Sequence, residues 1–482
     1  MIFNSIDFAI FLPIIFIFYW FITNKNLKLQ NFLIVSASYL FYGWWDWRFL
    51  SLILFSTIID YSIGRKLKTE NNQTNRKILL WTSIVVNLGF LGFFKYYNFF
   101  LDNFITAFSF FNTEIKANSL NIILPVGISF YTFQTLSYTI DVYKRKLEPT
   151  KDFIAFSAFV SFFPQLVAGP IERATHLLPQ FYKKRTFNYL KAVDGMRQIL
   201  WGLFKKIVIA DNCAEYANLI FNNSDDYSGS TLIIGAFFFT FQIYGDFSGY
   251  SDIAIGTSRL FGFDLSRNFN FPYFSRDIAE FWRHWHISLS TWFRDYVYIP
   301  LGGSQGGTWK KIRNTFIIFI VSGFWHGANW TFIAWGVLNA IYFLPLLLTN
   351  NNRNNIEIIV QGKLLFNIKV FLSILLTFTL TVFSWIFFRA NNIKHAINYI
   401  SEIFSASLFT MPNFEGVERA YKILILILIF VLIEWKGRYG QYAIANLKLK
   451  KSITLRYVIY YAIILAIFLF GGREQKFIYF QF

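Results

Sequence analysis

The sequence predicts an all-α polytopic membrane protein, on the grounds of its composition, its apolar runs and the placement of its charges. Hydrophobic residues fill 55% of the 482 positions and charged residues only 15%, whereas ordinary soluble domains carry about 25% charged residues. A water-soluble chain with 62 Phe, 27 Tyr and 15 Trp would expose large apolar patches. Cys213 is the single cysteine, so a secreted disulfide scaffold is excluded, and this residue is expected to be a small buried hydrophobe.

The apolar runs have lengths typical of membrane helices, since a bilayer core about 30 Å thick takes about 20 helical residues. The first run, Ile6–Ile22, has no basic region before it and no small-residue cleavage site, so we expect a retained membrane span. Several later runs are too short for a full crossing, which predicts re-entrant, tilted or interfacial helices. We expect about 11 to 13 membrane helices in all. The later runs are Phe32–Trp45, Phe49–Ile63, Ile78–Phe94, Phe99–Phe111, Leu120–Ile140, Phe153–Phe163, Met196–Ile209, Leu232–Tyr244, Phe316–Phe324, Trp330–Leu348, Phe366–Phe388, Ile423–Ile433 and Tyr457–Phe470.

Basic residues outnumber acidic ones, 45 to 27, and they gather in short blocks between the apolar runs. Examples are the blocks at 65–77, 183–185 and 310–313. This placement is typical of cytoplasmic loops under the positive-inside rule, and such blocks face anionic lipid headgroups. The lipid bilayer is therefore the expected partner of these charges, and nucleic acid is not.

The polar connectors between the runs are short. Those at 69–77 and 349–357 are too small to be domains, and no internal repeat is visible. We therefore expect a single membrane-embedded domain over residues 1–482, with a core at about 240–345 that carries the chemistry and an aromatic C-terminal tail at 471–482.

The middle third of the chain breaks the apolar pattern. An Arg, Lys or Asp at the centre of a membrane helix costs about 2.5–3.5 kcal/mol on insertion scales, so such residues usually face an interior cavity and have a function. The polar stretches are therefore the candidate functional site. They are Gln242–Asp252, Arg276–Tyr296, Tyr298–Gly303 and Ser322–Trp330.

A continuous helix over 276–296 would place three polar side chains on one face, at positions i, i+4 and i+8. These are Glu280, His284 and Ser288. Because His284 follows the charged Arg283, we expect it to be interfacial and solvated.

His286 and Ser290 would form part of the neighbouring stripe of the same helix, where they are expected to line a polar cavity. Trp282, Trp285 and Trp292 would hold the segment against lipid or protein. The alternative for His286 is a structural histidine satisfied by a hydrogen bond.

His326 is the strongest functional candidate, because it is a single ionisable residue inside an apolar segment. Gly323 and Gly327 flank it and leave room for backbone or substrate to approach closely. Asn329 could hydrogen-bond a ring nitrogen or a bound carbonyl. An imidazole in a low-dielectric site stays neutral near pH 7, so His326 could act as a general base. The alternative is a buried histidine satisfied by a carbonyl.

Motifs for a metal or a bound cofactor are missing from the sequence. Five histidines are fewer than the clusters of membrane di-iron enzymes, and there is no His-Glu-x-x-His pair. The sequence has no Gly-x-Ser-x-Gly elbow, Walker A loop or Gly-x-Gly-x-x-Gly turn. Serine hydrolase, ATPase and dinucleotide-dependent activities have no support, and we expect neither a metal nor a bound cofactor. The histidines are His176, His284, His286, His326 and His395.

Three of the polar stretches together resemble a known family. Arg283–Tyr296, Tyr298–Gly303 and Trp325–Trp330 are similar to the motifs of the membrane-bound O-acyltransferase (MBOAT) family. Within it, the chain resembles a bacterial branch that includes the membrane subunit of alginate O-acetyltransferase, and more distantly the D-alanyl transferases of teichoic acids. The resemblance covers essentially the whole chain. It implies a ring of helices around a thinned centre, where a funnel from each membrane face meets His326.

The resemblance also implies roles for individual residues. His286 and His326 match the two histidines of the family, and His326 matches its principal catalytic residue. Asn329, Trp325 and Ser290 would position the substrate. With no departure at these motif positions, the resemblance implies an O-acyltransferase that uses a buried histidine as general base.

The implied reaction takes an acetyl group from cytoplasmic acetyl-CoA across a bacterial cytoplasmic (inner) membrane for O-acetylation of an extracytoplasmic polysaccharide, alginate-like or a cell-wall glycan. Tyr479 matches a tyrosine in the aromatic tail of this branch and would carry the acyl group transiently; its alternative role is an interfacial anchor. A separate extracytoplasmic transferase, of SGNH type or similar, would complete the transfer to the polysaccharide.

Two alternative functions stay open. The donor could be the thioester of a carrier protein, as in the D-alanyl transferases. The polar band could also belong to a transporter of a polar solute, although transporters often show paired repeats and this sequence shows none.

Overall fold

The computed structural model describes the chain apart from residues 112–118, 356–366, 446–452, 472–474, 476 and 479–482. The described residues form helices and connecting segments without any strand, which confirms the all-α prediction. They divide into two compact units. The first is Met1–Ala192 with Ser258–Leu265, and the second is Val193–Thr257 with Ser266–Phe482.

Five helices of the described chain are long and apolar enough to cross a membrane, which agrees with a polytopic membrane protein. The helix Ile6–Ile22 is apolar but shorter. The five candidate spans are Gln73–Ser109, Gly229–Leu260, Trp330–Leu348, Ile368–Arg389 and Ile453–Phe470.

The apolar run expected at Leu120–Ile140 becomes helical only from Ile128. Pro125 has no amide hydrogen and disfavours helical geometry in the residue before it. Gly127 then adopts a left-handed conformation, with a φ of 76°, before the helix begins. Hydropathy measures the apolar character of this run but not the point at which its backbone can start a helix.

In the first unit, three helices surround a buried carboxylate. Asp60 on α3 accepts hydrogen bonds from Ser83 and Asn87 on α4 and from Thr139 on α6. These bonds replace water around a group that would be costly to bury alone. The helices of this unit are α1 (Ile6–Ile17), η1 (Phe18–Ile22), α2 (Leu27–Asp46), η2 (Trp47–Phe49), α3 (Leu50–Thr69), α4 (Gln73–Leu91), η3 (Gly92–Tyr96), α5 (Tyr97–Ser109), α6 (Ile128–Tyr143), α7 (Phe153–Ser161), α8 (Ala174–Leu177) and η4 (Leu178–Tyr182).

The second unit contains the polar stretches of the middle third. Its longest helix, α11, is mostly buried. The helices are α9 (Tyr189–Leu203, in this unit from Val193), η5 (Phe204–Ala210), α10 (Asp211–Asn222), η6 (Ser224–Asp226), α11 (Gly229–Leu260, in this unit up to Thr257), η7 (Pro272–Phe274), α12 (Ile278–His284), α13 (Ile287–Phe293), η8 (Arg294–Tyr298), α14 (Thr308–His326), α15 (Trp330–Leu348), α16 (Ile368–Arg389), α17 (Ile393–Ile403), η10 (Ala406–Phe409), α18 (Val417–Gly437) and α19 (Ile453–Phe470).

Glycines bring α9 and α11 into close backbone contact. A methyl group on Gly202 would meet the carbonyl oxygen of Gly249, and one on Gly249 would meet that of Gly202. Such small residues let two helices approach closely. The next segment of the chain, the π-helix η5, therefore places its lysines within reach of carboxylates on α11.

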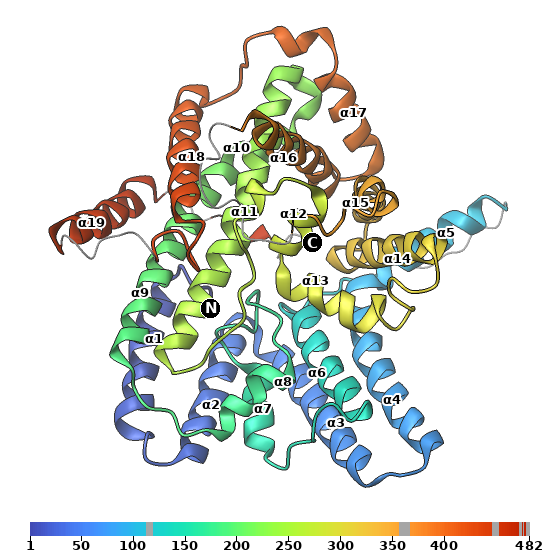
Figure 1. Cartoon of the computed structure of the whole chain (residues 1–482), viewed down its shortest axis with the longest axis vertical. Helices are drawn as coiled ribbons and strands as arrows, with labels where there is room; N and C mark the ends of the chain where they lie inside the picture. Colours follow the sequence, from blue (N-terminus) through green and yellow to red (C-terminus); the bar gives the residue numbers. More distant parts are fainter. Residues whose placement is uncertain (112–118, 356–366, 446–452, 472–474, 476, 479–482) are drawn as a thin grey trace. The chain divides into compact units, whose positions relative to one another are not determined.

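The helices α14 and α15 pack side by side (Figure 1). A Cβ on Gly323 would collide with the carbonyl oxygen of Phe332, and one on Gly336 would collide with that of Phe319. The two helices thus meet backbone to backbone near the end of α14, where His326 lies.

Candidate active site

The histidine-rich stretch is not the continuous helix expected from its spacing. α12 ends at His284 and α13 begins at Ile287. Between them His286 adopts a left-handed conformation, with a φ of 43°. Glu280, His284 and Ser288 therefore do not share the single helical face that was predicted. Histidine is among the residues that tolerate this conformation, which still costs about 1–3 kcal/mol unless its surroundings hold it in place.

A neighbouring segment holds the break in place. The Ile287 amide donates to the carbonyl of Asn268 (2.8 Å), and the Asn270 amide donates to the carbonyl of His284 (2.9 Å). The side chain of Asn268 also accepts from the Ser288 hydroxyl (2.9 Å). Backbone bonds on both sides of His286 leave its orientation little freedom.

Glu280 and His284 have different positions from those expected. Glu280 is fully buried and pairs with the Arg276 guanidinium at 2.7 Å, so it fixes the start of α12 and does not line a cavity. His284 is half-buried instead of solvated. Burial, together with the positive charges of Arg283 and Arg267, lowers the pKa of His284 to about 4.

His286 is almost completely buried, at 2% exposure, among aromatic rings. The ring centroids of Phe247, Phe269 and Trp325 lie 6.0, 6.1 and 6.3 Å from its own. Burial lowers its pKa to about 3, because the charged imidazolium would lose its hydration. Neither ring nitrogen bonds to another side chain or to backbone in the part of the chain that the structure describes. The described residues thus supply the imidazole of His286 with no partner for a structural hydrogen bond.

His326 is the last residue of α14 and is also buried, at 6% exposure. Its ring centroid lies 4.9 Å from Trp325, 5.3 Å from Trp335 and 5.2 Å from Phe388. Because Trp325 contacts both imidazoles, the structure brings His286 and His326 to one indole ring. The sequence placed them in separate motifs and could not show this arrangement.

The residues flanking His326 pack against the surrounding protein or hydrogen-bond its backbone. Gly323 and Gly327 face protein, since a Cβ would meet the carbonyl of Phe332 at the first and the Phe332 ring at the second. The side chain of Asn329 caps α15 by accepting from the Thr331 amide (3.0 Å). Its amide nitrogen donates to the carbonyl of Asn391 (2.9 Å). These contacts fix the chain immediately after the histidine.

A pocket of about 460 Å³ is lined by residues of α13 and α14, the helices next to these histidines in the chain, although neither imidazole lines it. Its volume is within the size range of small-molecule sites. Arg283, Arg294 and Arg353 line it, together with Ser290 of α13 and Ser322 of α14. Ser290 lines this pocket, but His286, which was expected beside it, does not, and apolar side chains such as Ile318 and Phe319 form much of the wall. Three guanidinium groups in one pocket favour a ligand that carries phosphate or carboxylate groups.

The pocket approaches His326 from one side. Ser322 precedes His326 by one helical turn, so both lie on the same face of α14. Trp282 also lines the pocket, and its ring lies 5.5 Å from that of Trp335, which contacts His326. Two tryptophan rings therefore separate the pocket from the imidazole.

The proposed relay tyrosine, Tyr479, lies outside the described residues. Two residues just before it, Phe477 and Ile478, are described and buried. Among the described residues, no group of three or more His, Cys, Asp or Glu side chains could hold a metal ion.

The motifs that contain His286 and His326 meet at Trp325. Comparison with known proteins shows which family carries these motifs. The sequence model of the membrane-bound O-acyltransferase family matches residues 142–388. The chain belongs to this family. It is therefore a membrane-bound O-acyltransferase.

Several relatives of this MBOAT protein match most of its length. The probable alginate O-acetylase AlgI of Azotobacter vinelandii is 38% identical over 447 residues, which is 92% of this chain and 86% of the relative. The peptidoglycan O-acetyltransferase of Helicobacter pylori is 35% identical over 418 residues, 81% of this chain and 77% of the relative. The teichoic acid D-alanyltransferase of Bacillus subtilis is 29% identical over 232 residues, 46% of this chain and 58% of the relative.

Sequence reasoning missed Asn268 as a residue of this site. The only local signal was a pair of asparagines, Asn268 and Asn270, among aromatic residues. The pairing of this segment with the histidine stretch depends on contacts between residues far apart in the chain, which a single sequence does not show.

Replacing Asn268 by alanine is expected to lower the melting temperature and the acyl-transfer rate of the MBOAT protein together. The change removes the side-chain bonds to Ser288 and Ser251 and leaves buried polar groups unpaired, at a cost of about 1–3 kcal/mol. Thermal unfolding and transfer activity of purified protein measure both effects. The matched control is Asn270→Ala, because the contact of Asn270 to His284 uses its backbone amide; equal losses in both variants would contradict the role given to the Asn268 side chain.

Proposed function

We propose that this enzyme takes an acetyl group from cytoplasmic acetyl-CoA and passes it across the bacterial inner membrane for O-acetylation of an extracytoplasmic polysaccharide. The relatives named as alginate O-acetylase and peptidoglycan O-acetyltransferase support a polysaccharide as the final acceptor. The observation that carries the proposal is a buried imidazole, His326, next to a pocket whose arginines suit a phosphate-bearing donor.

In the proposed reaction His326 acts as the general base. Its neutral imidazole removes the proton of an acceptor hydroxyl, and the hydroxyl oxygen forms a bond to the thioester carbonyl carbon. The carbon–sulfur bond then breaks, and the CoA sulfur leaves with the proton returned by the imidazolium. General-base assistance of this kind contributes about 10²–10⁴-fold to the rate.

His286 and Trp325 are proposed to position the thioester. The neutral imidazole of His286 can donate one hydrogen bond to the developing oxyanion, a contact that stabilises the transition state more than the ground state. Its left-handed backbone, held by the segment around Asn268, fixes this donor in advance. Ser290 is proposed to bind the donor in the basic pocket, and Asn329 to hold the chain beyond His326.

The basic pocket is proposed to bind the phosphates of CoA. Arg353 is the first candidate, because the guanidinium of Arg283 already donates to the backbone carbonyls of Asn352 and Asn355. Arg294 is the second, since its Nε already pairs with Asp295 (2.8 Å). Family membership favours acyl transfer over transport of a polar solute. A carrier-protein thioester is the second candidate donor, supported by the likeness to D-alanyltransferases.

The double variant Arg294→Gln/Arg353→Gln is expected to raise KM for acetyl-CoA about 10-fold or more while kcat changes little, because the lost charges bind ground state and transition state alike. Transfer from radiolabelled acetyl-CoA by purified protein measures both constants. Lys369→Gln/Lys394→Gln, a double neutralisation at exposed positions outside the pocket, is the charge-matched control.

Two outcomes of this assay would count against parts of the proposal. An unchanged KM in the arginine variant would remove the pocket as the donor site. Label transfer from an acylated carrier protein, but none from acetyl-CoA, would assign the carrier thioester as donor.

For the onward step we propose that Tyr479 accepts the acetyl group and passes it to a separate extracytoplasmic transferase of SGNH type. The chain's own contribution would then end at the tyrosine ester. A polysaccharide acceptor would be acetylated by the partner and not by this enzyme alone.

A further inference from the structure

The end of the chain returns to the interior of the second unit after α19. This helix contributes one buried side chain, Ile463, and ends at Phe470. Farther along, Phe477 and Ile478 are 5% and 0% exposed. Phe477 and Ile478 are thus packed more deeply than most of the helix that precedes them, which requires contacts that hold this part of the tail in place.

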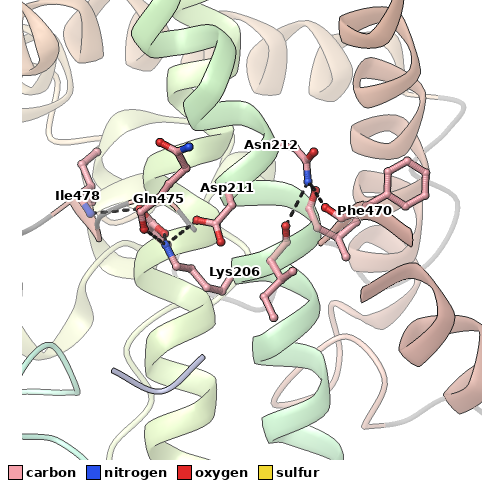
Figure 2. Close-up of polar contacts among 9 residues, drawn as sticks. Lys206, Asp211, Asn212, Phe470, Gln475 and Ile478 are labelled. Atoms are coloured by element: carbon pink, nitrogen blue, oxygen red, sulfur yellow. Dashed lines mark hydrogen bonds and ion pairs between the residues drawn. The ribbon is translucent and has the colours of Figure 1, made fainter. Parts of the chain in front are cut away.

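Those contacts come from a buried ion cluster formed by Lys206, Asp211 and Asp246. Figure 2 shows Lys206 and Asp211 of this cluster beside Gln475 and Ile478. The Lys206 ammonium lies 2.7 Å from a carboxylate oxygen of each aspartate. The three side chains are 8%, 6% and 2% exposed. Buried charges at such distances are stable only when hydrogen bonds satisfy their remaining atoms.

The tail adds backbone hydrogen bonds to this cluster. The backbone amide of Ile478 donates to the second carboxylate oxygen of Asp246 (3.2 Å). Lys206 donates to the backbone carbonyl of Gln475 at a longer 3.4 Å. Both contacts are to backbone atoms, so they fix the position and register of the tail whatever its side chains.

A second contact ties the start of the same segment. The side-chain amide of Asn212 donates to the carbonyl of Phe470 (2.9 Å), at the end of α19. Figure 2 shows Asn212 next to the cluster, one residue after Asp211 on α10. The chain from Phe470 to Ile478 is therefore held at both ends by the residues around η5.

The ion cluster also places the tail beside the catalytic centre. The ring of Phe477 lies 5.4 Å from Phe247 and 5.3 Å from Tyr250, both on α11. Phe247 in turn contacts His286, with their ring centroids 6.0 Å apart. One aromatic ring thus separates the tail from the imidazole.

From these contacts we propose that Lys206 and Asp246 are positioning residues of the acyl-transfer reaction, which clamp the C-terminal segment against the catalytic centre. The inference rests on the proposed function, since it gives the tail a part in the transfer. The residue that follows Ile478 in the sequence is Tyr479, the proposed relay residue. Asp246 is central, because it contacts both the lysine and the tail.

The test uses the full-length chain with Asp246→Ala, carrying Gln475→Cys as a probe in the tail. Labelling by a thiol-reactive maleimide reports whether the tail is held, and steady-state transfer of acetyl groups reports kcat and donor KM. We expect labelling to become at least 10-fold faster and kcat to fall at least 10-fold, with donor KM unchanged because the basic pocket is lined by other residues.

The matched control is Asp252→Asn, which breaks the neighbouring buried pair Lys205–Asp252 (2.6 Å). This pair joins η5 to α11 as the Lys206–Asp246 pair does, but neither residue has a contact to the described tail. We expect the control to lower the melting temperature without faster labelling. Asp246→Asn is the second variant if alanine prevents folding. It keeps an acceptor for the Ile478 amide and should release the tail less than alanine does. Asp246→Glu, which keeps the charge, should have a higher kcat than Asp246→Ala.

Each outcome decides the inference. Unchanged labelling in Asp246→Ala would show that the cluster does not hold the tail, and faster labelling with wild-type kcat would show that a held tail is irrelevant to transfer. Either result overturns the inference while leaving the proposed function intact. If the unaltered chain transfers no acetyl group from any donor, the proposed function fails instead, and the labelling rates still report whether the clamp exists.

Discussion

Replacing His326 by alanine is expected to reduce acyl transfer by about 10²–10⁴-fold, the contribution of a positioned general base. The imidazole is buried at the end of α14 among Trp325, Trp335 and Phe388. No other histidine contacts these three rings except His286, which contacts Trp325. Acetyl transfer by purified protein, compared at equal membrane levels, measures the effect.

His176→Ala is the control for this prediction. His176 is half-exposed, belongs to the first unit and pairs with Glu172 at 2.6 Å. We expect it to keep wild-type activity. A His326→Ala protein that folds and still transfers at the wild-type rate would remove the residue from the mechanism, and His326→Gln separates loss of the base from loss of packing because it retains a polar side chain.

Gly323→Ala is expected to destabilise the protein and to reduce transfer, although alanine is the better helix former. A Cβ at this position would collide with the carbonyl oxygen of Phe332, and a backbone atom cannot move away as a flexible side chain can. Overpacking of this kind costs about 1–3 kcal/mol, and separation of α15 from α14 would shift His326 against Trp335. Melting temperature and transfer rate should fall together.

The structure provides a matched control in Gly89→Ala on α4. A Cβ there would have no atom within 4 Å, so the substitution should be neutral or slightly stabilising, by about 0.5–1 kcal/mol, as glycine is poorly suited to a helix interior. If Gly323→Ala were as stable and active as Gly89→Ala, close contact between α14 and α15 would not be what positions the histidine.

The histidine stretch shows the limit of prediction from helical spacing. The sequence predicted that His286 and Ser290 would line one polar cavity, whereas the structure places Ser290 in a pocket with a mostly apolar wall and buries His286 among aromatic rings. The break at His286 was not expected, since its cause is the backbone pairing with Asn268 and Asn270. Helical periodicity reports only the residues within a few turns, and it carries no information on a partner segment.

The same limit applies to the ion cluster and the tail. Lys206, Asp211 and Asp246 are visible as charged residues in the sequence, but only the structure brings Ile478 to Asp246, which lies 232 positions earlier in the chain. Composition and hydropathy by themselves predicted an all-α membrane protein, and local chemistry singled out His326, because these are properties of short segments. His286 joined it as a candidate catalytic residue through the resemblance of its motif to the family. Tertiary structure alone decided that both histidines contact Trp325, that glycines let α14 and α15 pack closely, and that buried charges hold the tail. These three features depend on which backbone segments, distant in the sequence, can approach each other closely.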